Sequence, residues 1–485
     1  MTSRDTVASE SLASYATDFD QWYVDVVQRA GLADDAPVRG CKVIKPYGFG
    51  LWEQMVARLD ARIKATGVEN ACFPLFIPQS LLAREADHID GFAPEVAWVT
   101  RGGNHELEEP LAVRPTSEAI ICHSYAQWVQ SYRDLPILLN QWGNAVRWEE
   151  RPRAFLRTLE FLWQEGHTCH ATPQEADERA RMMLEVYRAF LEEDLAIPVT
   201  PGVKTESEKF AGALRTHTVE AMMGGKHWAL QAGTSHDLGD HFGRVFDIRF
   251  LDRDGERKFA HSTSFGLSHR VVGATIMVHG DAAGLQLPPL VAPVQVVIVP
   301  IWRDETARQV VAEAVSQAER ALAAAQVRVK TDWRDDHTPG FKFNEWELKG
   351  APLRLEIGPR DVAAGQVTLA RRDTREKRAV PAGALAAVVP DLLHEMQRAL
   401  FTAAAAMRAA HTAEVDAWDD LAARVAANAG WSLVHWCGGA ACEARLKAET
   451  KATIRCIPRD LPASAGPCIA CGGASAQRVI VARAY

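Results

Sequence analysis

The fold is decided by WGNAVRWEERPRAFLRTLEFLWQEGHT, residues 142–168 of a chain of 485. Two β-rich runs flank a basic turn at 151–153, and this pattern predicts an antiparallel hairpin. Arginines on a hairpin are usually solvated, but Arg147 alternates here with Val146 and Trp148 in the first run. More charged residues follow in the same segment: Glu149, Arg157, Glu160 and Glu165. A buried charge needs a partner, and the arginine fork matches phosphate or carboxylate, so the hairpin indicates an anion-binding site.

Length and composition divide the chain into about three domains, at the usual size of roughly 150 residues each. Amphipathic helical patterns and short β-rich runs alternate in residues 1–286, which predicts one large α+β domain. Within it, apolar residues recur at helical spacing in 19–27 and 51–63. After a proline-rich linker, alternating strand and helix patterns predict an α/β domain at 287–395. Alanine-rich helices and a cysteine cluster then mark a small α/β domain at 396–485.

Composition and charge exclude several classes of protein. Hydrophobic residues make up 47% and charged residues 24%, as in globular proteins, and no apolar run reaches the roughly 18 residues of a membrane span. Residues 1–20 lack the basic start and apolar core of a secretory signal, so we expect a cytoplasmic protein. The net charge of −8 argues against a protein that coats nucleic acid indiscriminately. The sequence contains neither a G-x-G-x-x-G fingerprint nor a P-loop, so it indicates neither a Rossmann-type nor a P-loop nucleotide site.

The cysteines point to a metal site. Five of the nine lie near the C-terminus, and four of them form two pairs. Cys437 and Cys442 are separated by four residues, Cys468 and Cys471 by two, and 25 residues lie between the pairs. This spacing is typical of a structural zinc site with four thiolate ligands, which stabilises a domain without taking part in catalysis. Cys456 falls outside both pairs and is expected to be buried.

Further motifs accompany the hairpin in a fixed order. In chain order they are GVENACFPLFIP with Pro74, ELEEPLAVRPTSE at 106–118, RWE at 147–149, FLRT at 155–158, FLWQEGH at 161–167, LQAGTSHDLG at 230–239, GLSHR at 266–270 and HGD at 279–281. Together they resemble the motifs of class IIa aminoacyl-tRNA synthetases in their prolyl form, of the archaeal- and eukaryotic-like type. The resemblance runs from about residue 15 to the C-terminus. It departs at Asp237, where an aromatic residue is common, and at Phe265, where tryptophan is frequent.

The resemblance implies a fold, a reaction and partners. The implied fold is α+β, with an antiparallel-sheet catalytic domain, an α/β anticodon-binding domain and a small α/β zinc-binding domain. The implied reaction converts L-proline and ATP to prolyl-adenylate and pyrophosphate, and then transfers prolyl to the 3′-terminal adenosine of proline tRNA. ATP, Mg²⁺ and structural Zn²⁺ are the implied cofactors. Motif 1, with Pro74, implies a homodimer.

The same resemblance assigns residues to the active site. Arg147 is expected to contact both the α-phosphate and the proline carboxylate, and Arg270 to act with it in catalysis. Thr116 and Glu118 would hold the proline nitrogen, although such a pair alone is more often a helix N-terminus. Trp163 and His236 would wall the proline pocket. The remaining residues of the implied ATP site are Glu149, Arg157, Thr158, Gln231 and Thr234.

Basic residues in the second domain predict contact with tRNA. RRDTREKR, at 371–378, holds five basic residues in eight, a pattern that alone indicates a solvated loop. The resemblance to an anticodon-binding domain favours RNA instead. Glu347, Arg354 and Arg360 are the candidates for reading guanine edges, because arginine pairs with O6 and N7 and a carboxylate accepts the N–H donors of guanine.

Rival functions make different demands on the sequence. A threonyl enzyme of the same class would need an active-site zinc with Cys/His/His ligands, and no such trio is evident. A catalytically inactive paralogue that only binds RNA would not need a complete nucleotide site. About 97 residues separate His167 from Phe265, too few for an editing insertion, so we expect misactivated alanine to be cleared by a separate protein. The last residue, Tyr485, is expected to be ordered against the catalytic domain.

Overall fold

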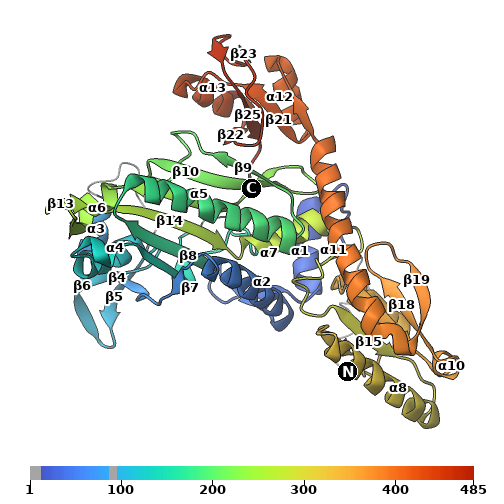
Figure 1. Ribbon diagram of the computed structural model, residues 1–485. Coiled ribbons are helices and arrows are strands. Elements are labelled where there is room, and N and C mark those ends of the chain that lie inside the picture. Colours follow the sequence, from blue (N-terminus) through green and yellow to red (C-terminus); the bar gives the residue numbers. More distant parts are fainter. Residues whose placement is uncertain (1–11, 87–95, 150) are drawn as a thin grey trace.

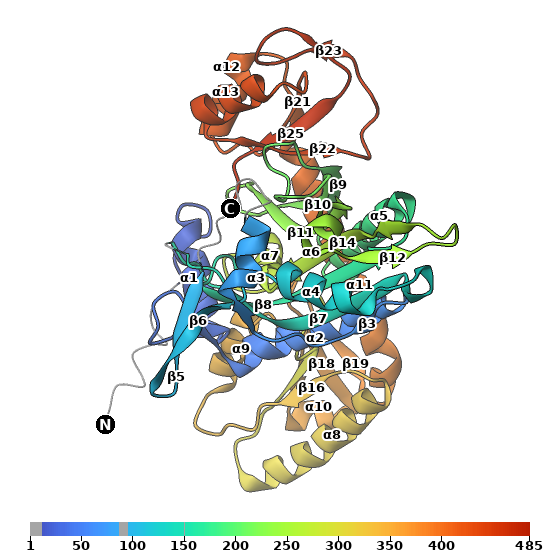
Figure 2. The ribbon, with the colours of Figure 1, turned by 90° about the vertical axis from the view of Figure 1, so that its left-hand side faces the viewer.

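The computed structural model describes residues 12–86, 96–149 and 151–485. Together, these residues fold into three bodies that follow one another along the chain (Figure 1). The expectation that the chain lacks a secretory signal concerns residues 1–20, of which residues 1–11 lie outside this described part. Figure 2 shows the three bodies in line, with the catalytic domain between the other two. Among the described helices, none has both the length and the apolarity needed to cross a bilayer.

The predicted hairpin is confirmed near one edge of an eleven-stranded sheet. Strand β7 (Ile137–Val146) pairs antiparallel with β8 (Glu160–His170), from Ile137 opposite Cys169 to Val146 opposite Glu160. Arg147 lies one residue beyond β7 and opens the loop, so its expected place inside a strand is wrong by one position. Further strands continue the sheet: β14 (His261–Ser268), β11 (Ala229–Gly239), β10 (Arg215–Met222) and β9 (Val199–Val203) on one side, and β3 (Glu69–Asn70) on the other.

Helices pack on this sheet, and two of them are those that apolar periodicity predicts at 19–27 and 51–63. The side chain of Asp18 accepts the backbone N–H of Gln21 and so caps the first helix, whose residues Trp22 and Tyr23 are buried. Thr172 and Glu175 form a capping box at the start of another, which a π-helical turn extends. These helices are α1 (Phe19–Arg29), α2 (Pro46–Lys64), α5 (Pro173–Ala189) with the turn Phe190–Asp194, and α7 (Arg270–His279).

The second body has the predicted α/β fold. Its sheet has the strand order β16-β15-β17-β18-β19, in which β15 pairs parallel with both of its neighbours and β17 to β19 pair antiparallel. Thr338 caps the helix α9, which has proline at its first position. The elements are β15 (Val296–Pro300), α8 (Glu305–Ala324), β16 (Val329–Thr331), α9 (Pro339–Leu348), β17 (Leu353–Ile357), α10 (Pro359–Ala363), β18 (Gln366–Arg371) and β19 (Lys377–Pro381).

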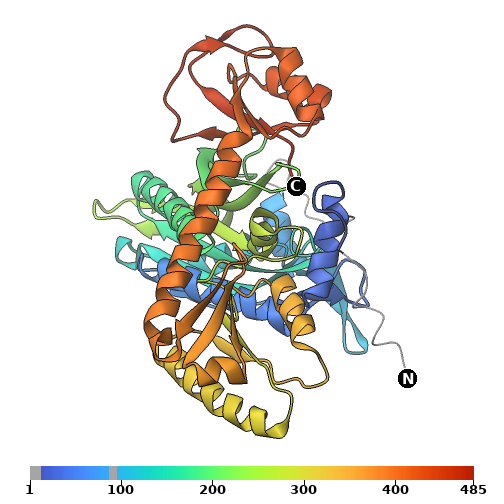
Figure 3. The same cartoon turned by 90° about the vertical axis from the view of Figure 1, so that its right-hand side faces the viewer.

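One long helix, α11 (Leu385–Ala410), joins the second body to the third (Figure 3). It passes without a break through residues 395 and 396, between which the sequence divided the two domains. The third body then follows with β20 (Thr412–Glu414), α12 (Trp418–Ala426), β21 (Trp431–His435), α13 (Ala440–Thr450), β22 (Thr453–Pro458) and β25 (Arg478–Ala482).

The third body extends the catalytic sheet instead of standing apart from it. Strand β22 pairs with β9, with Ile457 opposite Val203. At this seam the buried carboxylate of Glu220 accepts hydrogen bonds from Lys204, at 2.6 Å, and from Arg455, at 3.0 Å. The pair Arg455–Glu220 crosses the seam, and removing one partner would cost about 3–5 kcal/mol because the other charge would stay buried alone.

The chain ends against the catalytic domain, as expected. The backbone N–H of Tyr485 donates to the carbonyl of Ala229 at 3.1 Å, and its ring lies 5.0 Å from that of Trp228. The side chain of Arg153, in the loop after β7, lies over the Tyr485 ring at 5.8 Å. Tyr485 therefore packs against the catalytic domain, and its ordering in solution stays a prediction.

Candidate active site

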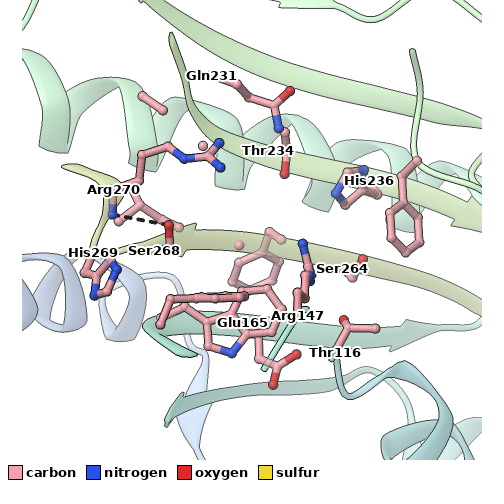
Figure 4. A pocket seen from close by; sticks show the side chains of 18 of the residues that line it. Thr116, Arg147, Glu165, Gln231, Thr234, His236, Ser264, Ser268, His269 and Arg270 are labelled. Carbon is pink, nitrogen blue, oxygen red and sulfur yellow. Dashed lines mark hydrogen bonds between the residues drawn. The ribbon is translucent and has the colours of Figure 1, made fainter. Parts of the chain in front are cut away.

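A cavity of about 530 Å³ opens on one face of the catalytic sheet (Figure 4). The strand register builds its floor, since Thr216, His236, Ser264 and His167 lie opposite one another in a row across four strands. Directly opposed residues in a sheet point to the same face, so the row faces the cavity as a unit. The loop 147–159 and the first residues of α4 (Glu118–Trp128) and α7 form the walls.

Every residue that the sequence assigned to proline or ATP lines this cavity. Figure 4 shows Arg270 at one end, His236 and Thr116 at the other, and Arg147 between them. The structure therefore brings together residues that lie up to 154 positions apart along the chain, from Thr116 to Arg270. They are Thr116, Glu118, Arg147, Glu149, Arg157, Thr158, Trp163, Gln231, Thr234, His236 and Arg270.

Three arginines, Arg147, Arg157 and Arg270, bring positive charge to the cavity. Arg147 donates from Nε to the carbonyl of Pro115 at 3.0 Å, and Arg270 donates from Nε to the carbonyl of Leu156 at 3.2 Å. Burial, with the neighbouring charges of Arg157 and Arg147, lowers the pKa of Arg270 to about 10. Burial also lowers the pKa of Arg147, although nearby carboxylates oppose that shift. Arg147 and Arg270 stay charged at neutral pH, so the repulsion between them favours a bound anion.

The surroundings of Arg147 fix its orientation. Its guanidinium faces the open cavity and lies over two aromatic rings, 5.3 Å from the centre of Phe161 and 5.5 Å from that of Trp163. Cation–π contacts of this length add about 0.5–2 kcal/mol each. The cation is thus held by a carbonyl and two rings, and none of these neutralises its charge.

A hydroxyl and a carboxylate meet at the opposite end. Thr116 donates its hydroxyl hydrogen bond to Glu118, the first residue of α4, and both side chains are buried. His236 lies near them on the sheet. Its Nδ1 is 3.0 Å from the hydroxyl of Thr216, which lies opposite it on the neighbouring strand. Burial, with the charges of two other histidines, lowers the pKa of His236 to about 3. The ring is therefore neutral and adds no positive charge beside Glu118.

Sequence reasoning missed a second layer beneath this pair. Glu165 accepts hydrogen bonds from the hydroxyl of Ser117 and the amide of Gln141, both at 2.5 Å, and its other oxygen lies 3.2 Å from Nε2 of His167. Burial alone would raise the pKa of Glu165, but these hydrogen bonds hold it below its usual value. The pKa of His167 is raised by Glu165 against the effect of burial. Glu165 thus anchors the start of α4.

The signal for this layer was present in the sequence. Phe161, Trp163, Glu165 and His167 alternate along β8, and alternate residues of a strand share a face. Once Trp163 is assigned to the cavity, the period of two assigns the other three as well. All four line the cavity.

The two departures from the family's motifs lie beside this floor. Phe265 is buried over Gly166, where a Cβ atom would come within 2.0 Å of its ring. Asp237 accepts the N–H of Gly239 at 3.0 Å and does not line the cavity. Phe265 can therefore affect the shape of the floor, whereas Asp237 is directed away from it.

The candidate anticodon residues divide into two groups. Glu347 and Arg354 line a cavity of about 170 Å³ on the second body, together with Arg375 and Lys377. Nε of Arg375 lies 3.1 Å from the Glu347 carboxylate. Arg360 is exposed on α10 and does not line this cavity. The cavity is strongly basic around one carboxylate.

The cysteine cluster has the dimensions of a tetrahedral thiolate site. The sulfurs of Cys437 and Cys442 are 3.7 Å apart, those of Cys437 and Cys471 are 3.8 Å apart, and Cys468 lies in the same group. A zinc ion with Zn–S bonds of about 2.3 Å requires S–S edges of about 3.8 Å. Gly438 and Gly472, which follow a ligand in each half, have φ values of 85° and 72° that suit glycine. Cys456 is buried, as expected.

Among the described residues, the only other group of metal-ligand type is Glu118, Glu165 and His167. A Cys/His/His set, which a threonyl enzyme would need, is not among the groups found in that part of the chain.

Three family models match the chain. They are the tRNA synthetase class II core domain (G, H, P, S and T) over residues 98–279, the anticodon binding domain over 295–392, and the C-terminal domain of prolyl-tRNA synthetase over 418–485.

Similar proteins match over nearly the full length. The proline–tRNA ligase of Natranaerobius thermophilus is 52% identical, with 98% of each chain covered. That of Roseiflexus castenholzii is 53% identical over 98% of this chain and 99% of its own. A crystal structure of prolyl-tRNA synthetase from Cryptosporidium parvum, complexed with halofuginone and AMPPNP, has a TM-score of 0.94 at 39% identity and covers 98% of this chain and 99% of its own.

The second layer yields a stability prediction. Replacing Glu165→Gln removes the charge that holds the proton on His167, so we expect the free energy of unfolding at pH 7 to fall by about 1–3 kcal/mol. A raised pKa adds stability below about pH 6.5 that is lost as the pH rises through the folded-state pKa. The difference from wild type should therefore shrink at pH 9.

Urea unfolding at pH 7 and pH 9 measures this difference. Glu160→Gln, at an exposed position of the same strand, is the control and should behave as wild type at both values. A Glu165→Gln variant as stable as wild type at pH 7 would contradict the anchoring role.

Proposed function

The chain belongs to the family of prolyl-tRNA synthetases, ATP-dependent ligases of proline and tRNA, and we propose that the cavity described above performs this reaction with the residues that line it. One observation carries the proposal. Three guanidinium groups that line the cavity match the phosphates of ATP, and the buried carboxylate of Glu118, at the end where Thr116 lies, matches an ammonium group. L-Proline carries both an ammonium and a carboxylate, so it can bridge the two ends.

In the first step, Glu118 and Thr116 bind the proline nitrogen and direct the carboxylate toward Arg147. A carboxylate oxygen attacks the α-phosphorus of ATP, a P–O bond forms, and the bond to the departing diphosphate breaks. Arg147 stabilises the charge that develops on the α-phosphate, while Arg270 and Arg157 attract the remaining phosphates and the nucleotide. The attacking carboxylate is already ionised at neutral pH, so positioning and electrostatics suffice without a general base.

The other lining residues complete the site. Glu149, Thr158, Gln231 and Thr234 supply polar contacts to the nucleotide. Trp163 and the neutral ring of His236 bound a compact pocket for the proline ring. In the second step the 3′-terminal adenosine of tRNA attacks the activated carbonyl, prolyl is transferred to its hydroxyl oxygen, and AMP leaves.

Magnesium would enter with ATP, and Glu149 would help to hold it. The residues present fit this cation, because the carboxylate of Glu149 lines the cavity, is partly exposed and lies 4.0 Å from its nearest cationic partner, Arg157. Carboxylate oxygens are the ligands that Mg²⁺ prefers. When bound, the ion would neutralise charge on the phosphates.

Arg147→Ala should lower proline-dependent ATP–pyrophosphate exchange by a factor of about 100–1000, because about 3–4 kcal/mol of transition-state stabilisation is lost. Arg151→Ala is the matched control, since Arg151 is an exposed arginine of the same loop that does not line the cavity. Its exchange rate should be that of wild type. Exchange by Arg147→Ala within tenfold of wild type would refute the assignment.

We also propose that the four clustered cysteines bind one structural zinc. The sulfur–sulfur distances support this, and thiolates are preferred zinc ligands. The backbone amides of Ala470 and Cys471 donate toward Cys468 and lower the pKa of its thiol to about 6, against the effect of burial. All four positions are occupied by protein, so the ion would stabilise the domain without taking part in catalysis.

Freshly reduced protein should contain one zinc per chain, and Cys468→Ser should contain much less. Cys72→Ser, at an exposed cysteine far from the cluster in sequence, should keep the full content. Metal analysis by mass spectrometry measures all three. Zinc-free wild-type protein, or equal zinc in Cys468→Ser, would contradict the proposal.

The basic cavity of the second body is the proposed anticodon site. Glu347 can accept the N–H donors of a guanine, and Arg354, stacked 4.1 Å over Phe343, is held beside it. Because Arg360 is exposed outside this cavity, it is the least supported of the three candidates.

Substituting Glu347→Gln should therefore raise the Kd for proline tRNA by about 5- to 150-fold, the equivalent of 1–3 kcal/mol for one base contact. Arg360→Gln should change the Kd less than twofold. Filter binding at fixed salt measures both, since salt alone shifts such affinities. Equal effects of the two variants would count against the cavity as the base-reading site.

Three partner and location proposals follow from family membership. The chain forms a homodimer, to which the exposed apolar residues Phe76 and Trp98 of one small sheet contribute, and the sedimentation mass of Trp98→Glu tests this. Alanyl-tRNA is cleared by a separate protein, because residues 168–264 form strands of the catalytic sheet, helix α5 with its π-helical turn, a short helix and a small hairpin, which leave no room for an editing domain; hydrolysis by the pure chain would refute this. The enzyme works in the cytoplasm, consistent with nine cysteines and no disulfide among them, and cell fractionation tests this.

A further inference from the structure

The catalytic domain and the anticodon-binding domain are joined by a buried arginine, Arg372. Its side chain is 3% exposed, and each of its three guanidinium nitrogens donates to a protein acceptor. Two of them bind the carboxylate of Asp281 in the catalytic domain, at 2.7 and 2.9 Å. The third, Nε, donates to the backbone carbonyl of Glu347 at 2.8 Å. Arg372 therefore links two domains and has no nitrogen directed only at solvent.

On the catalytic side, Asp281 is attached to the helix that begins with Arg270. Helix α7 ends at His279, two residues before Asp281, and is buried along most of its length. The carbonyl of Asp281 accepts the indole N–H of Trp22 at 3.0 Å, and its carboxylate also accepts from Gln286 at 2.9 Å. Ten helical residues span about 15 Å. A displacement of Asp281 along the helix axis would thus reach Arg270, because a closely packed helix moves as a unit.

On the other side, Glu347 belongs to the basic cavity. Its carboxylate is engaged by Arg375 at 3.1 Å, and it is the next-to-last residue of α9. The end of this helix is also fixed to the catalytic domain, since Leu285 donates its N–H to the carbonyl of Leu348 at 2.9 Å and Tyr47 donates its hydroxyl to that of Lys349 at 3.0 Å. A base that binds the Glu347 carboxylate competes with Arg375 directly above the Arg372 contact.

We propose that Arg372 is a positioning residue that couples occupancy of the anticodon cavity to the placement of Arg270, through Asp281 and helix α7. The inference rests on the proposed anticodon site at Glu347. The guanidinium of Arg372 is planar, and its bonds to Asp281 and to Glu347 fix the orientation of that plane. The link between the two domains is therefore stiff. A correct anticodon then raises the rate of the reaction as well as the affinity for tRNA.

The test is the maximal rate of aminoacylation at saturating tRNA, for proline tRNA and for the same tRNA with one anticodon guanine replaced. For wild type we expect the replacement to lower kcat by about tenfold, a usual size for coupling between sites. Lysine keeps the charge of Arg372 but cannot make the three bonds. At saturating tRNA, Arg372→Lys should therefore show nearly equal kcat values for the two tRNAs.

Three further variants test whether the effect arises at the Arg372–Asp281 contact. Asp281→Asn should reproduce the loss, and the double variant should be no worse than either single one, because both break the same link. Arg328→Lys is the matched control: Arg328 also crosses a boundary, with bonds of 2.8 to 3.1 Å to linker carbonyls, but it does not touch Asp281 or Glu347. It should keep the wild-type ratio of kcat values.

Proline-dependent exchange without tRNA reports on the fold and should stay within twofold of wild type in Arg372→Lys. Loss of exchange together with charging would show a structural role and overturn the proposal. A wild-type kcat ratio retained in Arg372→Lys, or a wild-type enzyme in which the anticodon affects only the Kd, would overturn it as well. Failure of the anticodon assignment itself is distinct, since it appears as an unchanged tRNA Kd in Glu347→Gln.

Discussion

Two buried guanidinium groups that backbone carbonyls hold close to each other and to Arg157 are the constraint on which the catalytic domain depends. Arg147 and Arg270 are oriented by backbone carbonyls, and these dipoles fix a side chain without cancelling its charge. Arg157 comes no closer than 4.0 Å to its nearest carboxylate partner, Glu149, and its side chain is half-exposed. The cost of this repulsion is met by the surrounding fold, and it is relieved when an anion binds. A site that binds phosphate strongly is therefore a site that is strained when empty.

Arginines at the domain seams are treated differently. Arg455 and Arg372 are buried, and each is paired with a carboxylate, Glu220 and Asp281 respectively. Pairing removes the net charge and leaves a firm, directional contact, which suits a joint between domains. The same side chain thus serves binding or assembly according to its acceptor. In the active site the acceptor is a neutral carbonyl, and at these two seams it is a carboxylate.

Much of the fold and of the site could be predicted from the sequence. The hairpin, the helices with four-residue apolar repeats and the lining of the cavity followed from periodicity and from motif resemblance, because strands and helices fix which residues share a face. Glu165 and His167 were missed although the alternation with Trp163 implied them. Arg147 was assigned to a strand, because the end of a hydrogen-bonded pairing leaves no mark on residue type.

Other features depend on contacts that have no local signal. The pairing of β22 with β9 involves few residues, so the extension of the catalytic sheet into the third body could not be foreseen. The helix α11 crosses the predicted domain boundary because the alanine-rich residues after it continue the helix that begins at Leu385. Arg371 and Arg372 looked like part of a basic surface strip, but both form ion pairs, with Asp373 and Asp281. Charge on a sequence does not reveal which charges the fold has already paired.

The central claim is that one cavity binds the ammonium of proline and the phosphate of a nucleotide at the same time. Calorimetric titration with a non-hydrolysable prolyl-adenylate analogue tests this most directly, with proline and AMP titrated separately for comparison. Because the analogue occupies both ends, it should bind at least about a hundredfold more tightly than either part alone. An analogue that binds no better than AMP would show that the two ends do not act on one ligand, and would contradict the account.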